Sequence, residues 1–197
     1  MDEASLRQHI LAHAQEHIDE RVTENAGENR DTAGKIQMFF EQGTDFHGDH
    51  RNLPWCAAFA SYCVVKGFGD VGAPLPVMKR GAVRTKLSAR CEDLKQAFSE
   101  AGRYVPLADI YDGAGHVKPG ARLPMPGDMI LFTEVFGLHA GLVYSFDVAA
   151  KKLVSVEGNN KPSKKRTSDP DLPEGVYTHE VSERRLMKID GFCRVAP

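Results

Sequence analysis

The sequence is short of several features that mark particular classes of protein. It has only four cysteines in 197 residues, and none of them forms a Cys-x-x-Cys pair. Neither a disulfide scaffold nor a zinc site of paired thiolates is therefore expected. No apolar run approaches the ~20 residues that cross a bilayer, so the sequence predicts no insertion into a membrane.

The sequence also has no large excess of positive or negative charge. The chain carries 25 Lys and Arg against 27 Asp and Glu, a formal net charge of -2. A nucleic-acid-binding domain is usually strongly basic, so this balance argues against nucleic acid as a partner. The first 22 residues have no basic start followed by an apolar block, so we expect no Sec signal peptide and synthesis in the cytoplasm.

The residues that are present are those of a globular domain, with 42% hydrophobic and 26% charged. A chain of this length buries about 70% of its unfolded surface, and one domain over residues 1–197 is predicted. Apolar side chains recur at helical spacing in the first half. The predicted helices lie at residues 4–22, about 32–43, 54–67 and 81–101.

The pattern changes in the second half. Residues 103–124 hold prolines and glycines at close intervals and are expected to form an irregular insertion. Short runs rich in Val, Ile, Leu, Phe and Tyr follow, separated by turn residues, and they predict an antiparallel sheet. These runs are 128–132, 140–146, 153–156, 175–181 and 187–195. The fold class is therefore predicted as α+β, with a helical part (about 1–102) packed on a C-terminal sheet (125–197) of about five to six strands.

Cys56 is the most informative residue of the helical part. It lies in the first turn of a predicted buried helix, directly after a polar loop and Pro54. The unbonded N–H groups at a helix start carry partial positive charge, which favours a thiolate over a thiol. A thiolate is a nucleophile, so the position suits covalent catalysis, although a small core side chain would fit there as well.

A nucleophilic cysteine needs a base and a group that orients the base. His139 opens a predicted strand and can face the helix start from the edge of the sheet. On the next strand, Glu157 and Asn159 share a face if the strand continues that far. Either is a candidate for the third member, and the sequence does not decide between them.

Five strings in order carry a resemblance to a known family. They are PWCAAFASYC, MPGDMILF, LHAGLVYSFD, LVSVEGNN and MKIDGFCRV. Together they resemble the CHAP-type amidases, relatives of the NlpC-type peptidoglycan peptidases with a papain-like fold. The resemblance covers roughly residues 25–197, and it includes the Pro-Gly-Asp turn, in which Asp128 is expected to have a structural role.

Carried over position by position, the resemblance implies that Cys56 is the nucleophile and His139 the general base. Glu157 or Asn159 would be the third member, and no metal or cofactor is implied. The backbone N–H of Cys56 is a natural oxyanion donor. The two further residues proposed for substrate binding or a second donor stand nearby in the sequence: Trp55 and Asn52. For Trp55, packing in the core is an equal alternative.

The resemblance implies a cysteine amidase or endopeptidase that hydrolyses peptidoglycan peptides. Since the wall lies outside the membrane and no Sec signal is expected, an antibacterial effector injected by a type VI-like secretion system is favoured. It would act in the periplasm or wall of a target bacterium, with a secretion carrier and an immunity protein as partners. The alternatives are a phage-type endolysin, a papain-like protease or deamidase acting on a protein, and a non-enzymatic binding module.

Other polar residues are interpreted as structural or solvated. Imidazoles and carboxylates gather in the loop over 43–53 and would suit a divalent metal, but a solvated loop is favoured. Its candidate ligands are Asp45, His47, Asp49 and His50. Helical spacing places His9, His13 and His17 on one face, expected to be solvated or to meet a partner. The remaining cysteines are expected to be buried apolar side chains: Cys63, Cys91 and Cys193.

Overall fold

The computed structural model of the chain describes most of its length. The described residues are 2–25, 33–51, 53–79, 82–83, 85–147, 150, 152–161 and 172–196. Among the sequence-based predictions, the cap of the second helix at Asp31 or Thr32 and the role of Asn52 lie outside these residues.

The first half of the chain is helical, as its periodicity predicts. Asp2 caps the first helix, because its side chain accepts a hydrogen bond from the Ala4 N–H at 3.1 Å. The third helix consists almost entirely of small and apolar residues and is buried along most of its length. The helices are α1 (Glu3–Asp19), α2 (Lys35–Gly43), α3 (Cys56–Asp70), α4 (Cys91–Glu100), and the short α5 (Leu107–Ile110) and α6 (Glu183–Leu186).

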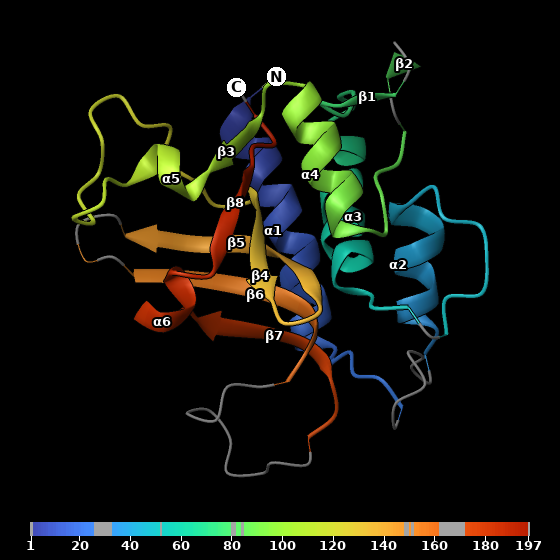
Figure 1. Cartoon of the computed structure of the whole chain (residues 1–197). Coiled ribbons are helices and arrows are strands. Elements are labelled where there is room, and N and C mark those ends of the chain that lie inside the picture. The colour runs from blue at the N-terminus through green and yellow to red at the C-terminus, as the bar shows by residue number, and fades with distance from the viewer. Residues whose placement is uncertain are drawn as a thin grey trace.

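The second half supplies nearly all of an antiparallel sheet of six strands among the described residues. Its order is β3-β8-β4-β5-β6-β7, so β8 returns to pair with β3 and β4. Its strands are β3 (Tyr104–Pro106), β4 (Met129–Glu134), β5 (Gly137–Asp147), β6 (Lys152–Asn160), β7 (Gly175–Glu180) and β8 (Ile189–Cys193). Figure 1 shows the helices α1 to α4 gathered beside this sheet, which gives the predicted α+β class.

Alternate residues of the central strands enter two separate apolar clusters. Leu131 of β4 and Leu142 of β5 belong to the large core that the sheet shares with α1 to α4. Their neighbours Ile130 and Val143 belong to a smaller core that includes Ile110 of α5. The period of two therefore places helices against one face and the α5 segment against the other.

One predicted helix is shorter than expected. The sequence predicted a helix over 81–101, but α4 begins only at Cys91. The reason lies at Ser88, whose hydroxyl bonds to Asp93 at 3.1 Å and accepts the Arg90 N–H at 3.2 Å. Such local side-chain bonds form a turn in competition with helix. Before this turn, a two-stranded antiparallel pair stands instead: β1 (Met78–Lys79) and β2 (Ala82–Val83).

The predicted irregular insertion at 103–124 begins with regular structure. Residues 104–106 form β3, which pairs with β8 at the edge of the main sheet, and α5 follows directly. An edge strand tolerates Pro106, since proline has no N–H to give to a neighbour. The pairing depends on a strand almost ninety residues later, which is why local sequence did not reveal it.

None of the helices in the described part of the chain has the length and apolar content needed to cross a membrane.

Candidate active site

Cys56 is the first residue of α3, as the sequence predicts. Pro54 stands just before the helix, and the N-cap residue Trp55 makes no side-chain hydrogen bond to the first turn. The N–H groups of that turn have no partner within the helix, and their partial positive charge faces Cys56. Only 4% of the Cys56 side chain is exposed.

His139 lies on β5, next to the start of α3. Its cross-strand partner is Phe132 of β4, so the two side chains share a face of the sheet. Its Nε2 atom lies 2.8 Å from Glu157 Oε2, and the ring acts on Cys56, whose pKa it lowers. Because Nε2 is taken by Glu157, Nδ1 is the nitrogen left to exchange a proton with the sulfur.

Of the two candidates for the third member, Glu157 on β6 is the one that contacts His139. Its side chain is fully buried, and its oxygens bind His139, Ser155, Asn160 and Arg185. The Arg185 contact is bidentate, with Nη1 at 2.9 Å from Oε1 and Nη2 at 2.6 Å from Oε2. A buried carboxylate with this many donors stays ionised and holds the imidazole in one orientation.

Asn159 has a different role from the one considered for it. Its φ is 54°, and the pairing of β6 with β7 shifts register between Glu157 and Asn160. The irregularity turns Asn159 away from Glu157, so the two do not share the face that simple alternation predicts. Asn159 Oδ1 instead accepts the Trp55 N–H at 2.8 Å, and its amide nitrogen binds Glu174.

Two glycines allow the helix and the strands to come this close. A Cβ at Gly158 would lie 2.7 Å from Trp55 Cζ3 and 2.8 Å from Phe59 Cβ. A Cβ at Gly141 would lie 2.7 Å from the Cγ of Glu157. The glycines beside His139 and Glu157 in the sequence are therefore explained by packing: a side chain there would displace the helix start or the carboxylate.

The electrostatics of the site favour an ion pair between sulfur and imidazole. Hydrogen bonds from the Cys91 thiol, from His139 and from the Ala140 N–H hold the pKa of Cys56 well below its ordinary value, against the effect of burial. Burial alone would lower the pKa of His139, but its bonds to Cys56 and Glu157 raise it to about 10. Burial alone would raise the pKa of Glu157, yet its contacts with His139 and Arg185 lower it.

Sequence reasoning missed two residues of this site. Arg185 of α6 holds Glu157 and stacks over the Phe132 ring, with Cζ at 4.3 Å from its centroid. Cys91, expected to be only a buried apolar side chain, is buried but places its sulfur 3.9 Å from that of Cys56. Neither residue stands in a motif, because both reach the site from elements distant in the sequence.

Trp55 belongs to the core and does not line a groove. Its side chain is fully buried, stacks on Phe39 with ring centroids 6.0 Å apart, and donates its indole N–H to Glu24 at 3.3 Å. Its backbone N–H is occupied by Asn159, so it is not a second oxyanion donor. Of the two interpretations of Trp55, packing in the core is therefore the one that its position supports.

The other residues singled out from the sequence lie outside this constellation. Asp128 has the structural role predicted for it: its oxygens accept bonds from the N–H groups of Met125 and Val195 and from Arg7. His17 is not on a solvated stripe, because it is fully buried against Phe39. In the described part of the chain, no three histidine, cysteine or acidic side chains converge as metal ligands, and Asp49 pairs with Arg51.

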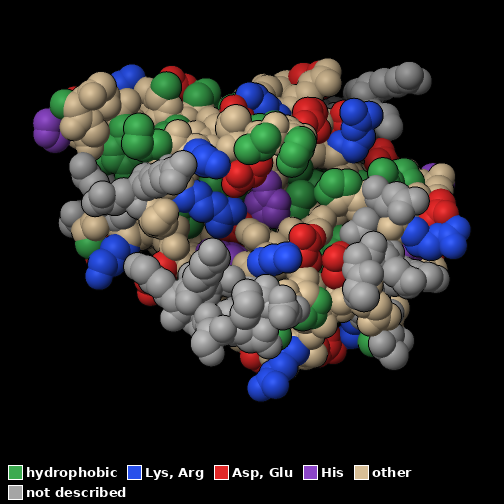
Figure 2. Space-filling model, turned by 60° about the horizontal axis from the view of Figure 1, so that its bottom comes forward, with side chains coloured by type: hydrophobic (Ala, Val, Ile, Leu, Met, Phe, Trp, Pro, Cys, Tyr) green, Lys and Arg blue, Asp and Glu red, His purple; other side chains and the backbone are tan. Residues whose placement is uncertain are grey.

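A polar groove of about 350 Å³ is lined in part by His139. Lys161, His179 and Arg185 line it together with Glu134, so its walls carry both signs of charge. Figure 2 shows a histidine side chain in a hollow of the surface, among acidic, basic and hydrophobic side chains. A substrate with polar or charged groups fits such walls.

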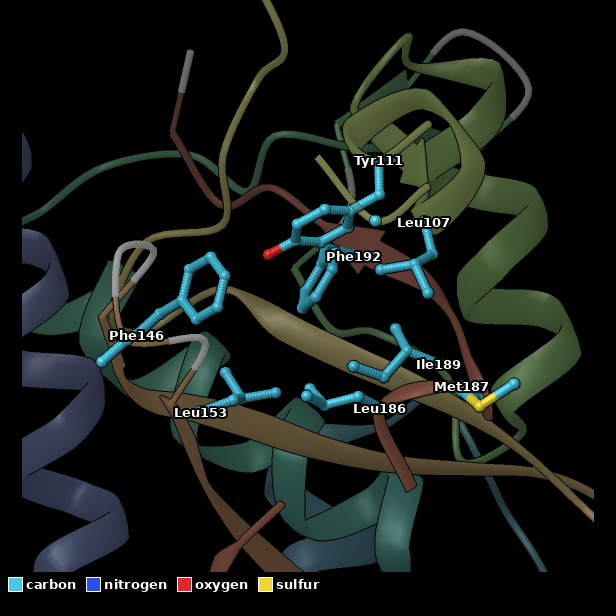
Figure 3. Close-up of a pocket in the computed structure, with 10 residues that line it drawn as sticks. Leu107, Tyr111, Phe146, Leu153, Leu186, Met187, Ile189 and Phe192 are labelled. Carbon is cyan, nitrogen blue, oxygen red and sulfur yellow. The ribbon is translucent and has the colours of Figure 1, made fainter. Parts of the chain in front are cut away.

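A second pocket, of about 430 Å³, is apolar, and Cys56 is not among the residues that line it. Figure 3 shows Phe146, Leu153 and Phe192 directed into it, with the Tyr111 hydroxyl at its edge. Phe192 and Leu153 belong to the smaller core, on the face of the sheet opposite α1 to α4. The described residues that line it include no cysteine, serine or threonine.

In comparisons with known proteins, the chain matches no protein-family model, no curated protein and no solved structure.

Proposed function

We propose that the protein is a cysteine hydrolase of the amidase or endopeptidase type, with Cys56 as nucleophile, His139 as acid and base, and Glu157 as the orienting carboxylate. The observation that carries the proposal is the buried His139–Glu157 hydrogen bond of 2.8 Å, placed so that the imidazole lowers the pKa of the Cys56 thiol at the start of α3. A purely structural cysteine has no need of a buried imidazole held by an ionised carboxylate.

The reaction that this arrangement supports is acyl transfer. The Cys56 thiolate attacks an amide carbonyl, and the carbonyl oxygen takes up the negative charge near the unbonded N–H groups at the start of α3. Imidazolium His139 gives its proton to the leaving amine, and the C–N bond breaks to leave a thioester on Cys56. Neutral His139 then takes a proton from water as the water attacks the thioester, which releases the acid and restores the thiolate.

The proposed substrate is a peptide of bacterial peptidoglycan, and the proposed setting is antibacterial. The order of the five strings that resemble CHAP-type amidases supports the substrate class. The groove beside His139, with Lys161 and Arg185 against Glu134, suits stem peptides that carry both carboxylates and amines. Delivery by a type VI-like system, with an immunity protein in the producer, would bring the enzyme to a target wall.

The test is digestion of purified sacculi, with the released fragments identified by mass spectrometry. The intact chain should release peptide fragments, and Cys56→Ala should release none. Cys63→Ala changes a buried thiol on the same helix and is the matched control, which should retain activity. Fragment release by the Cys56→Ala variant would contradict the proposal.

A protein substrate in a reducing compartment is the second candidate. The neighbouring thiol of Cys91, 3.9 Å from Cys56, favours it, because a thiol pair this close stays reduced most readily in a cytosol. Expression of the chain in the cytoplasm and in the periplasm of one bacterium separates the two candidates. Toxicity that depends on Cys56 in the periplasm supports a wall substrate, and toxicity in the cytoplasm alone supports a protease or deamidase.

A further inference from the structure

The sulfurs of Cys56 and Cys91 form a pair between two helix starts. Cys56 begins α3 and Cys91 begins α4, and their Sγ atoms lie 3.9 Å apart. Each retains a small exposed fraction, 4% for Cys56 and 5% for Cys91, whereas Cys63 and Cys193 are fully buried. None of the four cysteines takes part in a disulfide.

We propose that this pair is a redox modification site: a hydroperoxide oxidises Cys56, and Cys91 then closes a disulfide with it. The inference rests on the proposed function only in requiring Cys56 to be an activated thiolate. A disulfide has an S–S distance of about 2.05 Å, so the sulfurs must approach from 3.9 Å. That approach is short enough for side-chain rotation at two adjoining helix ends.

The chemistry balances in two steps. The Cys56 thiolate attacks one oxygen of the hydroperoxide, the O–O bond breaks, and the products are Cys56 sulfenic acid and, after protonation, an alcohol or water. The Cys91 sulfur then attacks the sulfenic sulfur, the S–O bond breaks, and water leaves with the thiol proton. Cys56 gives up two electrons in the first step, and the disulfide shares that oxidation between both sulfurs.

The environment gives the two thiols different roles. Beside the Cys56 thiolate, the Cys91 thiol is the hydrogen-bond donor, and that bond together with burial raises the pKa of Cys91. Cys91 is therefore unreactive while Cys56 is reduced. Oxidation of Cys56 removes the negative charge that holds this proton, so Cys91 becomes a nucleophile only when there is a sulfenic acid to resolve.

The modification would switch the enzyme off reversibly. A disulfide occupies the attacking sulfur and shields it from the irreversible sulfinic and sulfonic states. Reduction by a dithiol restores the thiolate. Exposure to a hydroperoxide would thus silence the chain until a dithiol reduces the bond.

The test treats the intact native chain with hydrogen peroxide, blocks free thiols under denaturing conditions, and maps tryptic peptides by mass spectrometry. Cleavage after Arg and Lys places Cys56 and Cys63 together in peptide 52–66 and Cys91 in peptide 91–95. We expect these two peptides to be linked, and fragmentation to assign the bond to Cys56. In the Cys63→Ala variant the linked peptide should persist.

The Cys91→Ala variant should form no linked peptide, and its Cys56 should advance to sulfinic acid that dithiothreitol cannot reverse. Thermal unfolding of this variant checks that it is folded, and Cys91→Ser supplies a second variant of near-native volume. In the parent chain, peroxide should abolish alkylation of Cys56, and dithiothreitol should restore it.

Two outcomes are distinguishable. If Cys56 is alkylated rapidly but never links to Cys91 after peroxide, the redox inference is wrong and the proposed hydrolase stands. If Cys56 reacts with neither alkylator nor peroxide, its activation is absent and the proposed function fails with the inference.

Discussion

At the scale of single residues, the site depends on one ionised sulfur whose charge several donors share. Cys91, His139 and the Ala140 N–H all hold the pKa of Cys56 down, whereas burial raises the pKa of Cys63 well above its ordinary value. Two cysteines on one helix thus have pKa values shifted in opposite directions, because their surroundings differ.

We expect His139→Ala to shift the alkylation of Cys56 to higher pH. The thiolate loses the imidazolium that stabilises it, so its pKa rises and the rate of reaction with iodoacetamide near neutral pH falls. The measurement is that rate across a pH series, followed on peptide 52–66. His116→Ala, at an exposed histidine, should leave the profile unchanged; an unchanged profile for His139→Ala would contradict the site.

Glu157→Gln should lower hydrolysis by on the order of a hundredfold or more, the usual effect of lost acid–base assistance. A neutral amide neither fixes the imidazole tautomer nor neutralises Arg185. Asn159→Ala should instead act on stability, costing about 1 to 3 kcal/mol because the Trp55 N–H loses its acceptor. Turnover and urea unfolding, measured for both variants, separate the two roles. If Asn159→Ala instead abolishes turnover and Glu157→Gln only lowers stability, Asn159 would be the third member.

The sequence alone points to Cys56 and His139 but not to the other residues of the site. Cys56 and His139 are recognisable because each stands at the start of an element with a distinct local pattern. The choice of Glu157 over Asn159 depends on an irregularity in β6 that strand alternation does not reveal. Arg185 and Cys91 come from separate short segments, and only tertiary packing brings them to the site.

At the scale of elements, the site is a contact between one helix start and two strands. β5 and β6 carry His139 and Glu157, and α3 presents Cys56 to them over Gly158. The positions of these elements follow from their hydrophobic periods, so the sequence predicts them well. The start of α4 and the edge strand β3 were missed, because a serine turn and a distant pairing decide them.

Gly158→Ala should destabilise the protein by about 1 to 3 kcal/mol, the usual cost of overpacking. The added methyl meets Trp55 and Phe59 and pushes α3 off β6, so alkylation of Cys56 should slow as well. Urea unfolding and the alkylation rate are the measurements. The control is Gly69→Ala on α3, where an added Cβ meets nothing within 4 Å. This change should be neutral or should stabilise the protein by about 0.5 to 1 kcal/mol. Equal effects of Gly158→Ala and Gly69→Ala would refute the packing argument.

At the scale of the whole molecule, the ion pair links stability to pH. His139 has an ordinary pKa of 6.5 that folding raises to about 10, so its contribution is complete below 6.5 and is lost as the pH rises through 10. Cys56 has an ordinary value of 9.0 that folding depresses, so its contribution is complete above 9.0 and is lost as the pH falls through the depressed value.

Together these shifts predict a pH range over which the contribution of the pair to the free energy of unfolding is constant. Between about pH 6.5 and pH 9.0, the folded chain holds one proton on His139, and the unfolded chain holds one proton on Cys56. Because the two states bind the same number of protons, stability does not depend on pH in this range. The measurement is the difference in unfolding free energy between the parent chain and a Cys56→Ala/His139→Gln variant. As the pH is raised from acid, this difference should increase up to about pH 6.5, stay constant to about pH 9.0, and decrease at higher pH. A difference that keeps changing through the neutral range would contradict the ion pair.

The residues of the candidate site lie on both sides of one exposed turn in the sequence. Cys56 precedes the mostly exposed turn at residues 112–120, whereas His139, Glu157 and Arg185 all follow it. A backbone break in that turn would leave the proposed nucleophile on one fragment and its proposed proton-transfer partners on the other. On the proposed function, each fragment alone would be inactive, and hydrolysis would return only by complementation, when the two pieces meet and rebuild the shared sheet.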